Sequence, residues 1–192
     1  MKNFIFSILL LGLSAVFVPY LSAQEKKTAE PPKPASSPSQ ELSWAWNAIG
    51  GKLLTMAEDF PEDKYDFKAQ QDERTFRGNL LHVAADCYTM LNAMKGSAFG
   101  PSSNEDSLRA HYPSKTDIVK LYKQLVDDGA QFIKEQGDST LTHEFKFPWG
   151  NFMTHGSLGW MSIIEHAGEH YGQLVVYYRV NGMIPPSSRP KK

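Results

Sequence analysis

Apolar side chains recur at helical spacing in four separate segments of this chain, and this pattern constrains the fold more than any other feature. In the third segment, for example, Ile118, Leu121, Leu125 and Phe132 fall on one face of a helix. The chain has no internal repeat and no sustained alternation of apolar and polar residues, the pattern of a half-buried strand. The sequence therefore predicts an all-α domain.

Capping residues and helix breakers set the limits of the four predicted helices. Thr75 and Ser114 are good N-caps, whereas Pro61 and Gly96 stand where the first two helices should end. Counting the capping residues, the helices are expected over 43–60, 75–95, 114–137 and 157–180. Four amphipathic helices joined by long connections predict a four-helix bundle.

Three long connections separate these helices. Residues 62–73 form an extended polar stretch, and residues 97–113 form a loop rich in Gly, Pro, Ser and Asn. Residues 138–156 include Phe145, Phe147, Trp149 and Phe152, which is too aromatic a composition for an idle linker. We expect this last loop to pack over one mouth of the domain.

The residues before the first helix divide into two parts. Lys2, an apolar run from Phe4 to Val18 and small residues ending at Ala23 are typical of a secretory signal peptide, 1–23. The run is short for a membrane span, which needs about 20 residues. Residues 24–40 contain four prolines and no bulky apolar side chain, the composition of a disordered linker. We therefore expect one domain, 41–192, in a secreted or periplasmic protein without a stable membrane anchor after cleavage.

Charge and cysteine content exclude two classes of protein. The formal net charge is -1, and the only basic cluster is the terminal 189–192, which argues against nucleic acid as a partner. Cys87 is the single cysteine, so an internal disulfide is impossible. It falls on the apolar stripe of the second helix, which predicts a buried and inert thiol.

Histidines form the most informative polar pattern. His166 and His170 are four residues apart and share one face of the fourth helix, and His82 lies on the second helix. Both histidine faces carry small and polar residues and point away from the densest apolar stripe. If the two faces meet, they enclose a cleft with room for a metal ion and a ligand; if they do not, all three histidines are solvated. Three histidine ligands leave an open coordination position, as in catalytic sites.

Two carboxylates adjoin these histidines. Asp86 lies one turn after His82 and is predicted as a partner of the histidines or a general base, with an exposed carboxylate as the alternative. Glu169 is predicted as a proton acceptor, with a solvated helix charge as the alternative. Gln173 and Tyr177 could position a ligand or simply pack. The order of residues differs from HExxH, which argues against a zincin protease.

The remaining histidines and the tryptophans have simpler interpretations. The loop histidines have no partner at ligand spacing: His111, His143 and His155. Three tryptophans are expected in the core rather than in a ligand-stacking box: Trp44, Trp46 and Trp160.

Three groups of residues resemble the DinB-like (YfiT-like) superfamily of metal-binding four-helix bundles. They are Arg74-Thr75-Phe76 with Leu80-Leu81-His82, the run from His166 to Leu174, and Tyr178 to Gly182 with Pro185-Pro186. The resemblance covers residues 44–188. It implies that His82, His166 and His170 bind a divalent metal ion, and a three-nitrogen site suits zinc or nickel.

The resemblance implies an activity only in outline. Members of the wider family include thiol S-transferases and isomerases, so we expect a metal-dependent transferase or related hydrolase-type enzyme for an unidentified small molecule. The expected export leaves the substrate class open, because low-molecular-weight thiols are chiefly cytosolic. The alternative is a non-catalytic, stress-associated module that binds a metal or ligand. Bundles of this family often pair, and the aromatic stretch 145–152 could form the interface of a homodimer.

Overall fold

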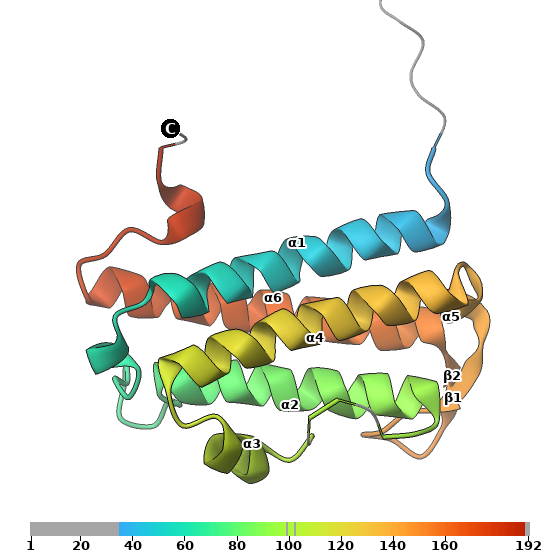
Figure 1. Ribbon diagram of the computed structural model, residues 1–192, viewed down its shortest axis with the longest axis horizontal. Helices are drawn as coiled ribbons and strands as arrows, with labels where there is room; N and C mark the ends of the chain where they lie inside the picture. Colours follow the sequence, from blue (N-terminus) through green and yellow to red (C-terminus); the bar gives the residue numbers. More distant parts are fainter. Residues whose placement is uncertain (1–34, 99, 102, 191–192) are drawn as a thin grey trace, which may run out of the picture. The chain divides into compact units, whose positions relative to one another are not determined.

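The computed structural model describes residues 35–98, 100–101 and 103–190, so the predicted signal peptide and residues 24–34 of the predicted linker lie outside the described residues. The described chain is mostly helical (Figure 1). Its elements are α1 (Pro38–Asp59), η1 (Glu62–Lys64), α2 (Phe76–Lys95), α3 (Glu105–His111), α4 (Lys115–Gln136), α5 (Ser139–Thr142), β1 (Glu144–Lys146), β2 (Met153–His155), α6 (Gly156–Val180) and η2 (Pro186–Ser188). Among the described helices, none combines the length and apolarity required to cross a membrane.

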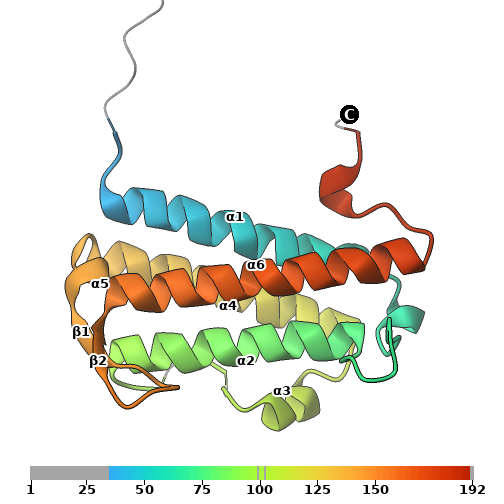
Figure 2. The same cartoon turned by 180° about the vertical axis from the view of Figure 1, so that it is seen from behind.

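Four long helices, α1, α2, α4 and α6, carry the core. Helices α1 and α2 each pack against both α4 and α6 (Figures 1 and 2). All four contribute to one cluster of buried apolar side chains, which includes Leu53, Leu80, Leu121 and Leu174. These helices correspond to the four that the apolar spacing predicts, because each must bury its apolar face against the others.

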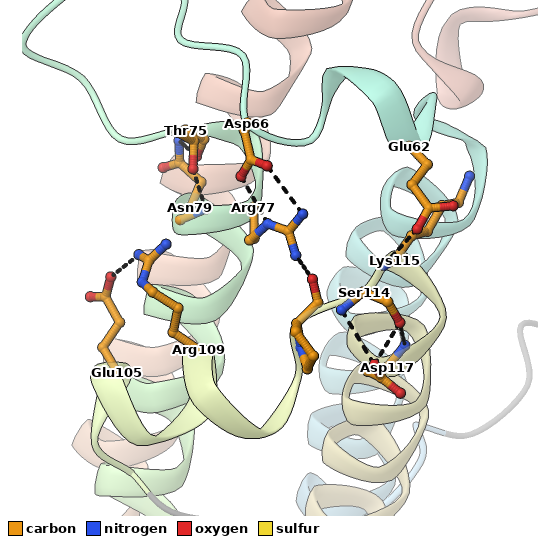
Figure 3. A network of polar contacts seen from close by, with 12 residues as sticks. Glu62, Asp66, Thr75, Arg77, Asn79, Glu105, Arg109, Ser114, Lys115 and Asp117 are labelled. Atoms are coloured by element: carbon orange, nitrogen blue, oxygen red, sulfur yellow. Dashed lines mark hydrogen bonds and ion pairs between the residues drawn. The ribbon is translucent and has the colours of Figure 1, made fainter.

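The predicted caps of α2 and α4 are confirmed. The Thr75 hydroxyl accepts a hydrogen bond from the backbone of Gly78, and Ser114 forms a capping box with Asp117 (Figure 3). Gly96 ends α2 with a φ of 71°, a left-handed conformation that glycine adopts without strain.

The predicted start of α1 was wrong. The helix begins at Pro38, five residues before the expected Ser43, and takes up the last three residues of the expected linker. Ser37 and Gln40 form a capping box, and Pro38 occupies the first turn, where its missing N–H leaves no hydrogen bond unmade. The same residues that suggest a disordered linker by composition therefore begin a helix.

Two connections contain more regular structure than expected. Residues 138–156 form α5 and an antiparallel hairpin, β1–β2, in which Phe145 pairs with Thr154. Each strand has three residues, too few for a visible alternation in the sequence. The predicted loop 97–113 contains α3, which is capped by Asn104 and buries Leu108. One buried apolar residue gives no helical period, so this helix was missed.

Helices α1 and α4 approach each other closely around Trp46. The Trp46 indole donates a hydrogen bond to the backbone oxygen of Val126 at 2.9 Å and lies over Gly129, where an added Cβ would be 2.4 Å from the ring. Trp46 also packs edge-to-face on Trp160, with ring centroids 5.5 Å apart. The core positions predicted for these two tryptophans are confirmed. The prediction for Trp44 was wrong: it is 75% exposed, because two positions along a helix turn a side chain away from the core.

Polar contacts fix the N-terminal end of α2, the helix that carries His82. The Arg77 guanidinium donates to Asp66 at 2.9 Å and to the backbone oxygen of Pro113 (Figure 3). It thereby joins the segment before α2 to the connection between α3 and α4. Lys115 donates to the backbone oxygen of Phe60 at 2.8 Å and ties the start of α4 to the end of α1.

The C-terminal segment is attached to the end of α1. Arg189 makes a two-pronged ion pair with Asp59, at 2.7 and 2.6 Å, and Tyr178 on α6 donates to the same carboxylate at 3.1 Å. These contacts, led by the hydrogen bond from Arg189, hold the pKa of Asp59 below its ordinary value. The ion pair therefore links three segments and is charged at neutral pH.

Candidate metal site

Three histidines converge between α2 and α6. The ring centroids of His82 and His166 are 5.2 Å apart, those of His82 and His170 are 4.9 Å apart, and those of His166 and His170 are 4.6 Å apart. One ligand nitrogen from each lies within 4.8 Å of the others. The two predicted histidine faces therefore meet, and the three residues could hold a metal ion.

Asn79 orients His170. The Asn79 amide nitrogen donates to the backbone oxygen of Thr75 at 3.4 Å and to the Tyr177 hydroxyl at 3.1 Å (the link to Thr75 is drawn in Figure 3). Its oxygen therefore faces Nδ1 of His170, at 2.8 Å, and can only accept. Nδ1 of His170 consequently carries the proton, and Nε2 keeps a free lone pair for a ligand bond.

Nε2 of His166 is buried and has no hydrogen-bond partner among the described residues. The nearest carboxylate oxygen, Oδ2 of Asp86, is 3.1 Å away but lies off the direction in which this nitrogen would donate or accept. A buried nitrogen that lacks a well-aligned hydrogen bond is destabilising. A metal ion among the three imidazoles would satisfy it, so the residues present fit such an ion.

Asp86 stands beside two of the three histidines. Its Oδ2 lies 3.4 Å from Nε2 of His82 and 3.1 Å from Nε2 of His166. Burial opposes its ionisation, yet the contact with His166 lowers the pKa of Asp86 below the ordinary value. The predicted proximity of Asp86 to the histidines is thus present, with an ionised carboxylate on the Nε2 side.

The outer edge of His82 faces charged residues from two other segments. Nδ1 of His82 is 3.6 Å from Glu105 on α3 and 3.4 Å from the guanidinium of Arg74. Glu105 also pairs with Arg109, at 3.2 Å (Figure 3). Only Arg74 is within hydrogen-bond distance, and a guanidinium can only donate, so Nδ1 of His82 is the acceptor of this hydrogen bond.

Burial lowers the pKa of two of the three imidazoles, those of His82 and His170. Burial, followed by the neighbouring His166 and His82 rings, lowers the pKa of His170 to about 4. Burial also lowers the pKa of His82, although Asp86 opposes this shift. Neutral imidazole is the form that binds metal ions, so protons do not compete for these two side chains at physiological pH.

The other predicted polar residues take different positions. Glu169 is 3.9 Å from Nδ1 of His166, on the side away from Asp86, and its side chain is exposed. Gln173 is exposed. Tyr177 is buried and belongs to the support of His170, since it accepts from Asn79 and donates to the backbone oxygen of Arg74.

The thiol and the three remaining histidines lie outside the site; His111, expected in a loop, ends α3, and His155 ends β2. Cys87 is buried, and burial raises the pKa of its thiol, as expected for an inert side chain. Nε2 of His143 is 2.9 Å from the backbone oxygen of Met94, a structural contact that the sequence did not predict. His155 is 3.8 Å from Glu144 across the hairpin, and Nδ1 of His111 is 2.7 Å from the backbone oxygen of Ser107.

A pocket of about 360 Å³ opens beside the triad. His166 and Asp86 line it together with Glu165 from α6 and two residues of the hairpin tip, Phe147 and Trp149. The aromatic connection therefore packs next to the histidines, as the sequence led us to expect of one mouth of the domain. A larger hollow of about 660 Å³ lies between the start of α1 and the end of α4, remote from the three histidines.

Asn79 and Glu105 are the site residues that sequence reasoning missed. Asn79 is an amide inside the apolar stripe of α2, one turn before His82, and it is only 1% exposed. An isolated amide at a core position needs a hydrogen-bond partner, and this signal could have identified it. Glu105 was hidden because α3 was expected to be a loop.

Comparison with known proteins identifies the family. A crystal structure of a DinB-like protein from Bacillus cereus has a TM-score of 0.66 at 18% identity, covering 77% of this chain and 95% of that one; at this identity the likeness concerns the fold. No curated protein matches the chain. The family model of the DinB superfamily matches residues 45–174, a range that includes all three histidines. This match extends over more than half of the sequence, and the chain therefore belongs to the DinB superfamily.

Proposed function

We propose that this protein is a metal-dependent enzyme whose divalent ion is held by His82, His166 and His170. The observation that carries the proposal is the buried Nε2 of His166, which has no hydrogen-bond partner among the described residues while a nitrogen of each other histidine lies within 4.8 Å. Three imidazole ligands suit zinc or nickel. Such an ion, when bound, acts as a Lewis acid and lowers the pKa of a coordinated water or thiol.

The chain's own residues supply the rest of the proposed chemistry. Asp86 is ionised, lies on the Nε2 side of two histidines, and can accept a proton from a substrate group in the adjoining pocket. Asn79 fixes the tautomer of His170. Glu169 was predicted as a proton acceptor; its place beside Nδ1 of His166 favours an orienting role. These roles fit transfer to a thiol or hydrolase-type reactions on a small molecule.

Elemental analysis tests the metal site. Wild-type protein loaded with zinc or nickel should retain close to one ion per chain, and His170→Ala should retain none, because two imidazoles alone bind weakly. His155→Ala is the matched control, since this exposed histidine lies on the hairpin and away from the triad. A wild-type protein that stays metal-free after loading would overturn the proposal.

The variant Asp86→Asn distinguishes a catalytic role from the alternative, a non-catalytic, stress-associated binding module. If Asp86 completes the coordination as a fourth ligand, the closed site is structural. Asp86→Asn would then lose metal and lower the melting temperature. If Asp86 is a base, Asp86→Asn keeps its metal and loses turnover, which a screen of thiols with electrophilic acceptors and of simple esters and amides would reveal. Glu169→Gln is the control and should reduce turnover less.

We also propose the finer features of fold, location and assembly. The mutual packing of α1, α2, α4 and α6 supports a four-helix bundle. The composition of residues 1–23 supports export and cleavage, which N-terminal sequencing of the protein from its native compartment would test. Phe152 and Met153 expose apolar surface at the hairpin, which supports a homodimer; light scattering that gives a monomer mass at high concentration would contradict it.

A further inference from the structure

The pocket beside His166 combines acidic side chains with aromatic walls, and we infer that it takes a small amine with an apolar or aromatic body. The inference rests on the proposed function in that the pocket adjoins the candidate metal site. The volume, about 360 Å³, is within the range of about 300–1,000 Å³ found for small-molecule sites. The charge and the wall chemistry of the pocket then select the class of ligand.

The pocket is negatively charged. Asp86 and Glu165 line it, and none of the described residues that line it is a lysine or arginine. The Asp86 carboxylate already lies beside the imidazoles of His82 and His166. Glu165 is exposed and has no hydrogen-bond or ion-pair partner among the described residues, so its charge is available to a ligand. Lys146, which precedes Phe147, is exposed on β1, and the guanidinium of Arg74 lies on the other side of the triad, 3.4 Å from Nδ1 of His82.

The opposite wall is aromatic and comes from the hairpin tip. Phe147 packs edge-to-face on Trp149, with ring centroids 5.8 Å apart, and stacks on Phe152 at 5.0 Å. Phe152 braces Phe147, while Trp149 remains 51% exposed. An exposed indole face attracts a cation, with a contribution of about 0.5–1 kcal/mol at such a site. It also offers apolar surface to the body of the ligand.

The positions of the two carboxylates give the ligand a direction. Glu165 precedes His166, so its side chain is turned about 100° around α6 and lies at the solvent side. Asp86 lies at the inner end, beside Nε2 of His166. A ligand whose amine contacts Glu165 and whose body lies on Trp149 therefore presents its other end to the triad. An anionic ligand would instead meet two carboxylates.

Three probes of similar shape test this assignment on the full chain: 2-phenylethylamine (cation), 3-phenylpropanamide (neutral) and 3-phenylpropanoate (anion). Affinity is measured by calorimetry, with metal content determined on the same samples. The amine should bind about five- to tenfold more tightly than the amide, from one exposed ion pair and one cation–π contact, and the anion should bind most weakly. Glu165→Gln should reduce the preference for the amine to the part that the cation–π contact supplies, about two- to fivefold, and Trp149→Ala should weaken both ligands and remove that part.

Matched controls separate this inference from the proposed function. Glu169→Gln removes a neighbouring exposed carboxylate that does not line the pocket and should keep the preference for the amine. The same preference in His170→Ala would support the pocket even if the metal proposal fails. A wild-type protein that binds metal but prefers the amide or the anion, or binds none of the three, would overturn the inference and leave the metal site standing.

Discussion

The helix pair α1–α4 and the helix pair α2–α6 belong to one core but differ in the groups that lie between the two helices. Between α1 and α4, Gly129 lets the Trp46 ring lie directly on the helix, and the space is filled by apolar atoms. Between α2 and α6, Asn79 and His170 are buried as polar groups, and Nε2 of His166 has no hydrogen-bond partner among the described residues. Close packing stabilises a fold, whereas a polar group kept at a stability cost indicates a function. The difference therefore assigns stability to one helix pair and the candidate metal site to the other.

The largest expected effect is that of Trp46→Ala, which tests the assignment of stability to α1–α4. Removal of a 2%-exposed indole should lower the free energy of unfolding by about 3–5 kcal/mol, because it leaves a cavity and removes the hydrogen bond to the backbone oxygen of Val126. Chemical denaturation measures the loss. Trp44→Ala is the control and should change stability by at most about 0.5 kcal/mol, since Trp44 is 75% exposed. The folded fraction of Trp46→Ala should keep its metal; loss of metal there would break the comparison.

Asn79→Ala should give the next largest effect and should act on the other helix pair. Without the amide oxygen, Nδ1 of His170 loses the acceptor that fixes its tautomer, and outer-shell partners of this kind contribute about 10–100-fold to metal affinity. Competition with a chromogenic chelator measures the affinity. Asn47→Ala, which removes an exposed amide on α1, should leave the affinity unchanged. Equal affinities for the wild type and Asn79→Ala would show that Asn79 serves packing alone.

A smaller effect is expected from Gly129→Ala. The new methyl group would overlap the Trp46 ring, which is held by its hydrogen bond and cannot move away freely. Overpacking lowers the free energy of unfolding by about 1–3 kcal/mol, and the better helix propensity of alanine partly offsets this. A net destabilisation of about 1 kcal/mol is therefore expected. Gly51→Ala adds the same methyl group to α1 in open space and should be neutral or stabilising. Thermal unfolding of the two variants gives the sign; a stabilised Gly129→Ala would mean that the α1–α4 contact is loose.

The smallest effect on stability is expected from Asp59→Asn, which removes a charge at the end of α1. Asp59 has a lowered pKa in the folded protein, so its ion pair with Arg189 stabilises the fold above the unfolded-state pKa, and the stabilisation is lost as pH falls through the folded pKa. Asp59→Asn should therefore be about 0.5–1 kcal/mol less stable than the wild type at pH 7. The difference should shrink between about pH 5 and pH 3. Chemical denaturation of both proteins at pH 7 and at about pH 3 measures the difference in free energy of unfolding. A difference that does not change with pH would rule out the ionic contribution.

The sequence predicted the four long helices and the grouping of the histidines because both follow from the helical period of about 3.6 residues. Residues three and four apart share a helix face, which places His166 beside His170 and gives each helix its apolar stripe. Trp44 was placed wrongly because the spacing of a single aromatic residue does not decide its face. The start of α1 was missed because proline and serine are common both in linkers and in first turns, and only the pairing of Ser37 with Gln40 distinguishes them.

The rest of the site depends on contacts between distant segments. Asn79 and His170 are 91 positions apart, and their hydrogen bond follows from the way α2 and α6 face each other. The approach of Glu105 to His82 requires α3, whose single buried apolar residue leaves no period to detect. The hairpin could not be predicted for the same reason, because strands of three residues each are too short to show an alternation. Tertiary packing, rather than local preference, determines these parts.

The pairing of Phe145 with Thr154 has a consequence for how this protein can diversify. Because side chains alternate along a strand, Phe145 points inwards while Glu144 and Lys146 point to solvent. An insertion of two residues in each strand would keep this alternation and lengthen the tip, whereas a shift by one residue would turn the buried ring outwards. The hairpin can therefore change its reach in steps of two residues without disturbing α2 or α6. Relatives with altered ligand preference should differ first in the length of this hairpin, while Asn79 and the three histidines stay the same.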